Sequence, residues 1–139
     1  MDTYQNELLD QGYIYLGAEI TEYTAITICE KIIYLNNCVK DLESINLIIN
    51  SGGGCTWSTF SIVNMMEWSK IPINTIGLGI IASGAFIIFI AGKKRILTQT
   101  SGILSHRFSK GNYGNYSDLI ADRKYEDRLH DTMINHYMK

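Results

Sequence analysis

Ser83 and His106 are the two side chains of this sequence that best fit nucleophilic catalysis. Ser83 lies between Ala82 and Gly84, and these small neighbours would let a carbonyl carbon approach its hydroxyl. His106 ends an apolar, strand-like stretch, and a neutral imidazole within reach of a serine hydroxyl can accept its proton. Taken alone, a serine between small residues is more often a helix N-cap. The GxSxG elbow is also absent, because Ile81 stands where its first glycine belongs.

A run of glycines follows the most apolar predicted strand. Ser51-Gly52-Gly53-Gly54 comes directly after Ile45–Asn50, and backbone N–H groups at such a corner can approach a ligand closely. A phosphate-binding P-loop is not supported, because Cys55 and Thr56 follow Gly54 where that motif has Lys-Ser/Thr. The spacing does not match a dinucleotide fingerprint either. On its own, the run indicates a loop that needs glycine conformations.

Metal and disulfide chemistry are not expected, and no cofactor is predicted. His130 and His136 are six residues apart, which does not match the HExxH spacing of a zinc site. The three cysteines are odd in number and form no CxxC pair. This pattern fits reduced thiols in a cytoplasmic compartment better than a disulfide framework or structural zinc. The cysteines are Cys29, Cys38 and Cys55.

Composition and charge favour one globular domain and exclude several partners. The chain has 139 residues, of which 46% are hydrophobic and 19% charged, enough for one sizeable core. A net charge of −2 gives no reason to expect binding to nucleic acid or to an anionic membrane. The uncharged segment from Ile71 to Gly92 is long enough to cross a bilayer, but Pro72 and three glycines interrupt it. We therefore expect a buried strand followed by a buried helix.

Apolar runs alternate with helical patterns along the chain. The predicted strands are Tyr13–Leu16, Ile45–Asn50, Asn74–Leu78, Arg95–Leu97 and Ile103–Ser105. Thr21 is expected to cap a helix over Glu22–Asn37, and further helices are predicted at Trp57–Ser69, after Ser83, and from Asp118 to the end. The unbroken apolar run Ile45–Asn50 is typical of a strand covered on both faces. Strands that alternate with helices predict an α/β fold with a mainly parallel sheet.

The order and spacing of these segments resemble the Clp protease proteolytic subunit (ClpP) family of serine peptidases. Ile45–Gly54 (INLIINSGGG) is similar to that family's strand ending in INSPGG, with Gly52 replacing the usual proline. Gly77–Phe86 (GLGIIASGAF) is similar to the GxAASMGA block around the nucleophile, with Gly84 replacing the usual methionine. The spacing between the two blocks matches the family without a gap.

The likeness continues through the second half of the chain. Ile90–Leu97 (IAGKKRIL) resembles the segment AGxxGKRxxL with two residues deleted. His106 falls where the family has the histidine of its MIHQ motif. Gly111–Asp118 (GNYGNYSD) is similar to the glycine-rich handle strand and the start of the handle helix. The resemblance thus covers nearly the whole chain.

The resemblance implies a fold and a set of site residues. The fold would be a ClpP/crotonase-like spiral of repeated β-β-α units with a handle strand and helix, as one domain over residues 1–139 that ends after the handle helix. Ser83 would attack a peptide carbonyl while His106 accepts its proton. The N–H groups of Gly54 and Gly84 would stabilise the oxyanion, and Gly53 would line the same substrate site. Glycine in place of methionine at position 84 is expected to loosen this corner.

One member of the family's catalytic triad has no counterpart in this sequence. The family's orienting aspartate lies beyond the handle helix, and the sequence stops at Lys139 before reaching it. Three outcomes follow: a Ser-His dyad, another carboxylate in the same role, or an inactive subunit. Asp118, Asp122, Asp127 and Asp131 are more typical of solvated helix positions, and none of them is assigned.

The resemblance also implies substrates and partners. The chain would be a serine endopeptidase subunit that cleaves small peptides or unfolded proteins inside a homo-oligomeric ring, a heptamer or a stacked double ring. A Clp-type ATPase would be its partner, although few residues precede Leu8 to form the axial loops that dock it. The expected compartment is the cytoplasm, a plastid stroma or an infected host cytoplasm. The alternatives are an inactive ClpP-like structural subunit and a crotonase-like acyl-CoA enzyme.

Overall fold

The structure, a computed structural model, describes residues 2–105 and, farther on, residues 124, 127, 128, 130–132, 134, 135 and 138. The chain divides into two compact units, residues 1–104 and 105–139. The described residues between 124 and 135 are helical, which agrees with the helix predicted there. His106 and the predicted handle segment Gly111–Asp118 lie outside the described residues.

The first unit is built on a parallel sheet. Its strand order is β1-β2-β3-β4, and the remaining strand, β5, pairs with β3; every pair is parallel. The strands are β1 (Tyr13–Leu16), β2 (Ile45–Ser51), β3 (Ile73–Ala82), β4 (Arg95–Leu97) and β5 (Gly102–Leu104). The helices are α1 (Thr3–Asp10), α2 (Glu22–Cys38), α3 (Thr56–Trp68) and α4 (Gly84–Ile90). This confirms the predicted α/β class with a parallel sheet.

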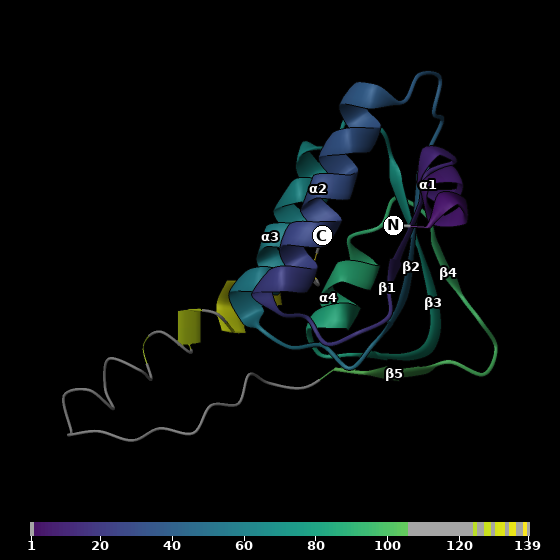
Figure 1. Cartoon of the computed structure of the whole chain (residues 1–139). Coiled ribbons are helices and arrows are strands. Elements are labelled where there is room, and N and C mark those ends of the chain that lie inside the picture. Colours follow the sequence, from purple (N-terminus) through teal and green to yellow (C-terminus); the bar gives the residue numbers. More distant parts are fainter. Residues whose placement is uncertain are drawn as a thin grey trace. The chain divides into compact units, whose positions relative to one another are not determined.

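Three helices cover one face of the sheet. In Figure 1, α2, α3 and α4 lie together on one side of the strands. Helix α1 packs beside β1 and is joined to α2 by the hydrogen bond from the Tyr34 hydroxyl to Asp10 at 2.7 Å. Along β2, Ile45, Leu47 and Ile49 are fully buried, whereas the residues between them are only half-buried. The expectation that this strand is covered on both faces is therefore wrong for the described part of the chain. The core lies between the sheet and the three helices.

The longest strand, β3, pairs with two later strands in succession. Thr75–Gly77 lie beside β4, and Ile80–Ala82 lie beside β5. Between these two stretches Gly79 has a φ of 72°, and a Cβ there would lie 2.5 Å from Asn50 Oδ1. That same amide oxygen accepts a hydrogen bond from the Ile80 N–H at 3.1 Å. Only glycine fits this bend, which lets β5 reach the carboxyl end of β3.

The uncharged segment from Ile71 to Gly92 forms β3 and α4. This confirms the predicted strand followed by a buried helix, but β3 is buried only at alternate positions and is exposed at Gly79 and Ile80. Among the described residues, no helix has both the length and the apolarity needed to span a bilayer. The predicted cap of α2 is also confirmed, because Thr21 and Thr24 exchange side chain-to-backbone hydrogen bonds at 2.8 and 3.2 Å.

Candidate active site

Two strand-to-helix corners meet at one edge of the sheet. The β2–α3 corner contains Gly53 and Gly54, and the β3–α4 corner contains Ser83 and Gly84. The two strands are parallel neighbours, so their carboxyl ends lie at the same edge, where ligands bind in open α/β sheets. A Cβ on Gly53 would lie 2.8 Å from the Ser83 Cβ and 2.9 Å from the Gly84 nitrogen. The structure therefore brings these predicted residues together.

Ser83 has a backbone conformation that is rare for a residue with a side chain. Its φ is 53° and its ψ is −124°, and a non-glycine residue in such a conformation costs about 1–3 kcal/mol. The Ser83 N–H donates to the Leu104 carbonyl at 2.8 Å, and the Ser83 carbonyl accepts from the Phe86 N–H at 3.0 Å. These backbone bonds from β5 and α4 hold the strained corner in place.

The hydroxyl of Ser83 is not used to cap α4. The residue occupies the N-cap position, but its side chain makes no capping hydrogen bond, and it is half-buried at the corner. The simpler interpretation of Ser83 as a helix cap is therefore not supported. A strained serine that does not cap its helix resembles the position of the nucleophile in a strand-to-helix elbow.

The GxSxG pattern does not describe this corner, because the first glycine of the pattern is missing. In a GxSxG elbow, glycine two residues before the serine makes room at the turn, and here Ile81 occupies that position. The residue that approaches the Ser83 Cβ is instead Gly53, from the neighbouring corner. Gly53 thus takes the place of the elbow's own glycine, which becomes apparent only from the pairing of β2 with β3.

Gly84 is required by a neighbour on α3. A Cβ at Gly84 would collide with the hydroxyl of Thr59, which is 0% exposed and donates to the Cys55 carbonyl at 2.9 Å. The expectation that glycine at position 84 loosens the corner is wrong, because Thr59 fills that space. Sequence reasoning missed Thr59, which lies 25 residues before Gly84 (84 − 59).

The N–H of Gly54 points toward the side of β2 on which Ser83 lies. The Gly53 carbonyl accepts a hydrogen bond from the Ile20 N–H at 2.9 Å, on the β1 side of the corner. In a trans peptide the C=O and the following N–H point in opposite directions, so the Gly54 N–H is directed away from Ile20 and toward β3. Gly54 is exposed, so this N–H lies at the surface of the site.

A second backbone donor belongs to the neighbouring corner, where the Gly84 nitrogen is 2.9 Å from a Cβ built on Gly53. Gly84 is the first residue of α4, and the opening N–H groups of a helix have no partner within it. Together with Gly54, it can supply two N–H groups at the edge where Ser83 stands. His106 lies outside the described residues, and so do Asp118 and Asp122. No group of three or more His, Cys, Asp or Glu side chains suited to a metal occurs in the part of the chain that the structure describes.

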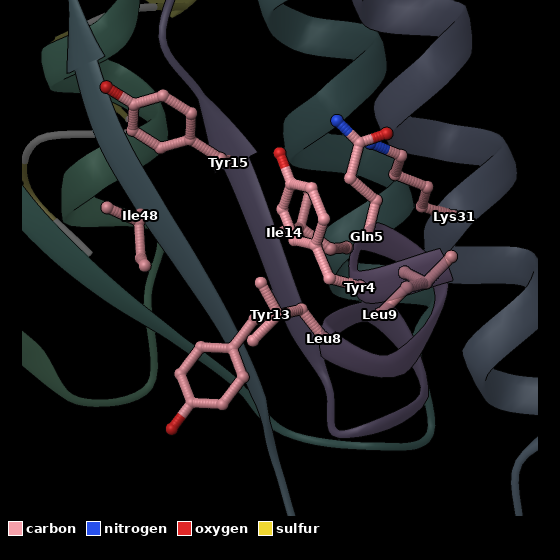
Figure 2. A pocket seen from close by; sticks show the side chains of 9 residues that line it. All are labelled: Tyr4, Gln5, Leu8, Leu9, Tyr13, Ile14, Tyr15, Lys31 and Ile48. Atoms are coloured by element: carbon pink, nitrogen blue, oxygen red, sulfur yellow. The ribbon is translucent and has the colours of Figure 1, made fainter. Parts of the chain in front are cut away.

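The structure has one pocket between α2 and α3 and another between α1 and β1. One, of about 490 Å³, opens between the starts of α2 and α3 and is lined by Glu22, Cys29, Cys55, Trp57 and their neighbours. Hydrogen bonds to Ser58 lower the pKa of the exposed Cys55 thiol in this pocket. The other, of about 660 Å³, lies between α1 and β1, with Tyr4, Leu8, Tyr13 and Tyr15 around it (Figure 2). None of the predicted site residues lines the second pocket.

A comparison with protein families and curated proteins gives a consistent result. A family model described as Clp protease matches residues 1–139. The chain is 30% identical over 136 residues to the ATP-dependent Clp protease proteolytic subunit of Deinococcus radiodurans, covering 96% of this chain and 66% of that protein. It is 32% identical over 127 residues to the subunit of the same name from Porphyromonas gingivalis, covering 89% of this chain and 56% of the relative.

A third relative extends the range of organisms. The ATP-dependent Clp protease proteolytic subunit 3 of Frankia casuarinae is 32% identical over 121 residues, which cover 86% of this chain and 56% of the relative. The chain therefore spans between 56% and 66% of the length of these three curated relatives.

Proposed function

The chain belongs to the Clp protease family, and on this premise we propose that it is a serine-type peptidase subunit with Ser83 as its nucleophile. The observation that carries the proposal is the Ser83 corner. The residue keeps a strained backbone at φ 53°, does not cap its helix, and lies against the glycine corner, where a Cβ on Gly53 would be 2.8 Å from the Ser83 Cβ. A structural serine would need none of these features, whereas they suit a nucleophile at a strand-to-helix elbow.

His106 is the proposed general base. It follows Leu104 by two residues, and the Leu104 carbonyl accepts the Ser83 N–H at 2.8 Å. This closeness in sequence to a residue that bonds Ser83 supports His106 as the base. His106 would take the Ser83 proton during attack and return it to the leaving amine.

The N–H groups of Gly54 and Gly84 are the proposed donors to the tetrahedral oxyanion. Both belong to the backbone, so the methionine-to-glycine difference at position 84 leaves the donor itself intact. A preorganised donor of this kind contributes about 3 kcal/mol to the stability of the transition state. Gly53 would line the substrate site beside them, where its lack of a side chain lets Ser83 approach.

The proposed substrates are peptides and unfolded proteins, and the proposed assembly is a homo-oligomeric ring, a heptamer or a stacked double ring, in the cytoplasm or an equivalent compartment. The names of the curated relatives, which are ATP-dependent proteolytic subunits, support a Clp-type ATPase as partner. The outer face of the sheet also carries apolar side chains, with Tyr15 at 56% and Ile96 at 55% exposure, as a protein that associates would.

Two measurements test this proposal. A fluorophosphonate should label the wild-type chain at Ser83, and a short fluorogenic peptide should be hydrolysed by the wild type and not by Ser83→Ala. Ser69→Ala, which changes a serine at the other end of α3, is the matched control and should keep both signals. Absence of labelling and hydrolysis in the wild type would overturn the proposal and favour a structural subunit. Saturable coenzyme A binding without labelling would favour an acyl-CoA enzyme.

A further inference from the structure

We infer that Ser51 is a positioning residue that holds the glycine corner in the conformation the proposed oxyanion site requires. The inference rests on the proposed function, because it concerns the direction of the Gly54 N–H. Ser51 is the last residue of β2 and is 3% exposed, so its hydroxyl must find partners within the protein. It does not touch the proposed substrate itself and would act through Gly53.

The hydroxyl of Ser51 makes two hydrogen bonds that join three segments. Its Oγ donates to the Ala18 carbonyl at 2.7 Å and accepts from the Gly53 N–H at 3.1 Å. The roles are fixed by chemistry, since a carbonyl can only accept and an N–H can only donate. One side chain therefore ties the glycine corner to the link between β1 and α2.

The link between β1 and α2 also bonds the carbonyl group of Gly53. The Gly53 carbonyl accepts from the Ile20 N–H, so both polar groups of this glycine are bonded, one through Ser51 and one through Ile20. Ile20 is 1% exposed and precedes Thr21, whose capping box starts α2. The Gly53–Gly54 peptide thus has its orientation set against a rigid part of the fold.

Removing the hydroxyl would free the corner at the place where it is intrinsically most mobile. Gly53 has a φ of 93°, and glycine samples many conformations when nothing restrains it. Without Ser51 Oγ, the Gly53 N–H and the Ala18 carbonyl would lose their partners, and the Gly54 N–H would no longer be preorganised. A donor that must reorient during the reaction stabilises the transition state less, so the loss is expected mainly in kcat.

The test compares two serines with the same hydrogen-bonding pattern. Ser69 Oγ donates to the Ile71 carbonyl at 2.7 Å and accepts from Asn36 Nδ2 at 2.9 Å. It follows the last residue of α3, a helix about 20 Å long that starts at the site. Ser51→Ala should lower kcat roughly tenfold to a hundredfold with little change in KM, somewhat less than the loss of an oxyanion donor itself. Ser69→Ala should lower thermal stability and leave kcat unchanged.

A second measurement reports on the oxyanion site directly. A peptide boronate forms a tetrahedral adduct with a serine nucleophile, so its affinity should fall in Ser51→Ala by about the same factor as kcat, and not in Ser69→Ala. Ser51→Cys keeps the size of the side chain with a weaker donor and acceptor, and it should give intermediate values. It also serves if the alanine variant does not fold.

The outcomes separate this inference from the proposed function. Wild-type kcat and boronate affinity in Ser51→Ala would overturn the positioning role and leave the peptidase proposal standing. An equal loss of kcat in Ser69→Ala would also overturn it, because general loosening would then explain the effect. A wild-type chain that neither hydrolyses peptide nor reacts with a fluorophosphonate would overturn the proposed function, and the inference with it.

Discussion

The two corners that meet at the candidate active site reach their conformations by opposite means. The β2–α3 corner uses glycines, with φ of 93° at Gly53 and 155° at Gly54, and hydrogen bonds to the β1–α2 link hold it. The β3–α4 corner places a serine at φ 53° and holds it by a bond to β5 and by packing of Thr59 on Gly84. The β2–α3 corner contributes only backbone N–H groups, so it can consist of glycines, which adopt positive φ without strain. The β3–α4 corner contributes the hydroxyl of Ser83, so it needs a side chain at positive φ and is strained.

The largest expected effect comes from the strained serine. Ser83→Ala and Ser83→Gly should each reduce peptide hydrolysis by at least about a thousandfold, since the nucleophile is lost. They should differ in stability, because alanine keeps the strained Cβ and glycine removes it. We expect the glycine variant to be more stable by about 1 kcal/mol in urea denaturation. Equal or lower stability of the glycine variant would show that the conformation of Ser83 carries no strain.

The next effect contrasts two adjacent glycines of the first corner. A Cβ on Gly53 would lie 2.8 Å from the Ala82 oxygen, whereas a Cβ on Gly52 would meet nothing within 4 Å. Gly53→Ala should therefore lower the free energy of unfolding by about 2–3 kcal/mol and abolish activity. Gly52→Ala is the matched control and should be neutral or stabilising by up to about 1 kcal/mol. Similar stabilities of the two variants would contradict the close approach of the corners.

A smaller effect should link Thr59 to Gly84. Gly84→Ala places a methyl group against the buried Thr59 hydroxyl and should cost about 1–3 kcal/mol of stability. Thr59→Ala removes that hydroxyl and its bond to the Cys55 carbonyl, at a cost of about 1 kcal/mol. The double variant should lose less stability than the sum of the two single losses, by about 1 kcal/mol in a double-mutant cycle. Strict additivity would mean that the two residues do not share this space.

The smallest expected effect concerns thiols beside the glycine corner. Hydrogen bonds to Ser58 lower the pKa of Cys55, whereas burial raises the pKa of Cys29 in the same pocket. The thiolate is the reactive form, so Cys55 should react with iodoacetamide at lower pH than Cys29 when labelled peptides are followed by mass spectrometry. Glu22→Gln should move the Cys55 profile further down, because the charge of Glu22 raises this pKa. If Cys55 and Cys29 showed the same dependence of labelling on pH, the opposite shifts of their pKa values would be contradicted.

The sheet was predictable because its signals are local. Apolar runs next to glycines located β1 and β2 within one residue, and Thr21 marked the start of α2. The strand β3 is longer than predicted, since its second half, Gly79–Ala82, is held by pairing with β5 that no local pattern announces. Helix α1 was missed because Thr3–Asp10 has few apolar residues and none that is buried.

The resemblance named candidate site residues, and no local pattern revealed how the structure holds them. Resemblance assigned Ser83, Gly53, Gly54 and Gly84, and the structure brings these four together. Two supports, Thr59 and the Ile20 backbone, are far in sequence from the glycines they hold. The third, Ser51, is two residues from Gly53, but its second bond reaches back to Ala18. The role of His106 stays a prediction.

The hydrogen bond from the Ser83 N–H to Leu104 has a consequence for the time at which the site forms. A ribosome releases the chain from its N-terminus, so Ser83 emerges 21 residues (104 − 83) before the carbonyl that holds it. Until β5 pairs with the second half of β3, nothing from that strand maintains the strained serine. The nascent chain therefore carries the Ser83 hydroxyl for an interval before β5 is available to hold this corner in its strained conformation.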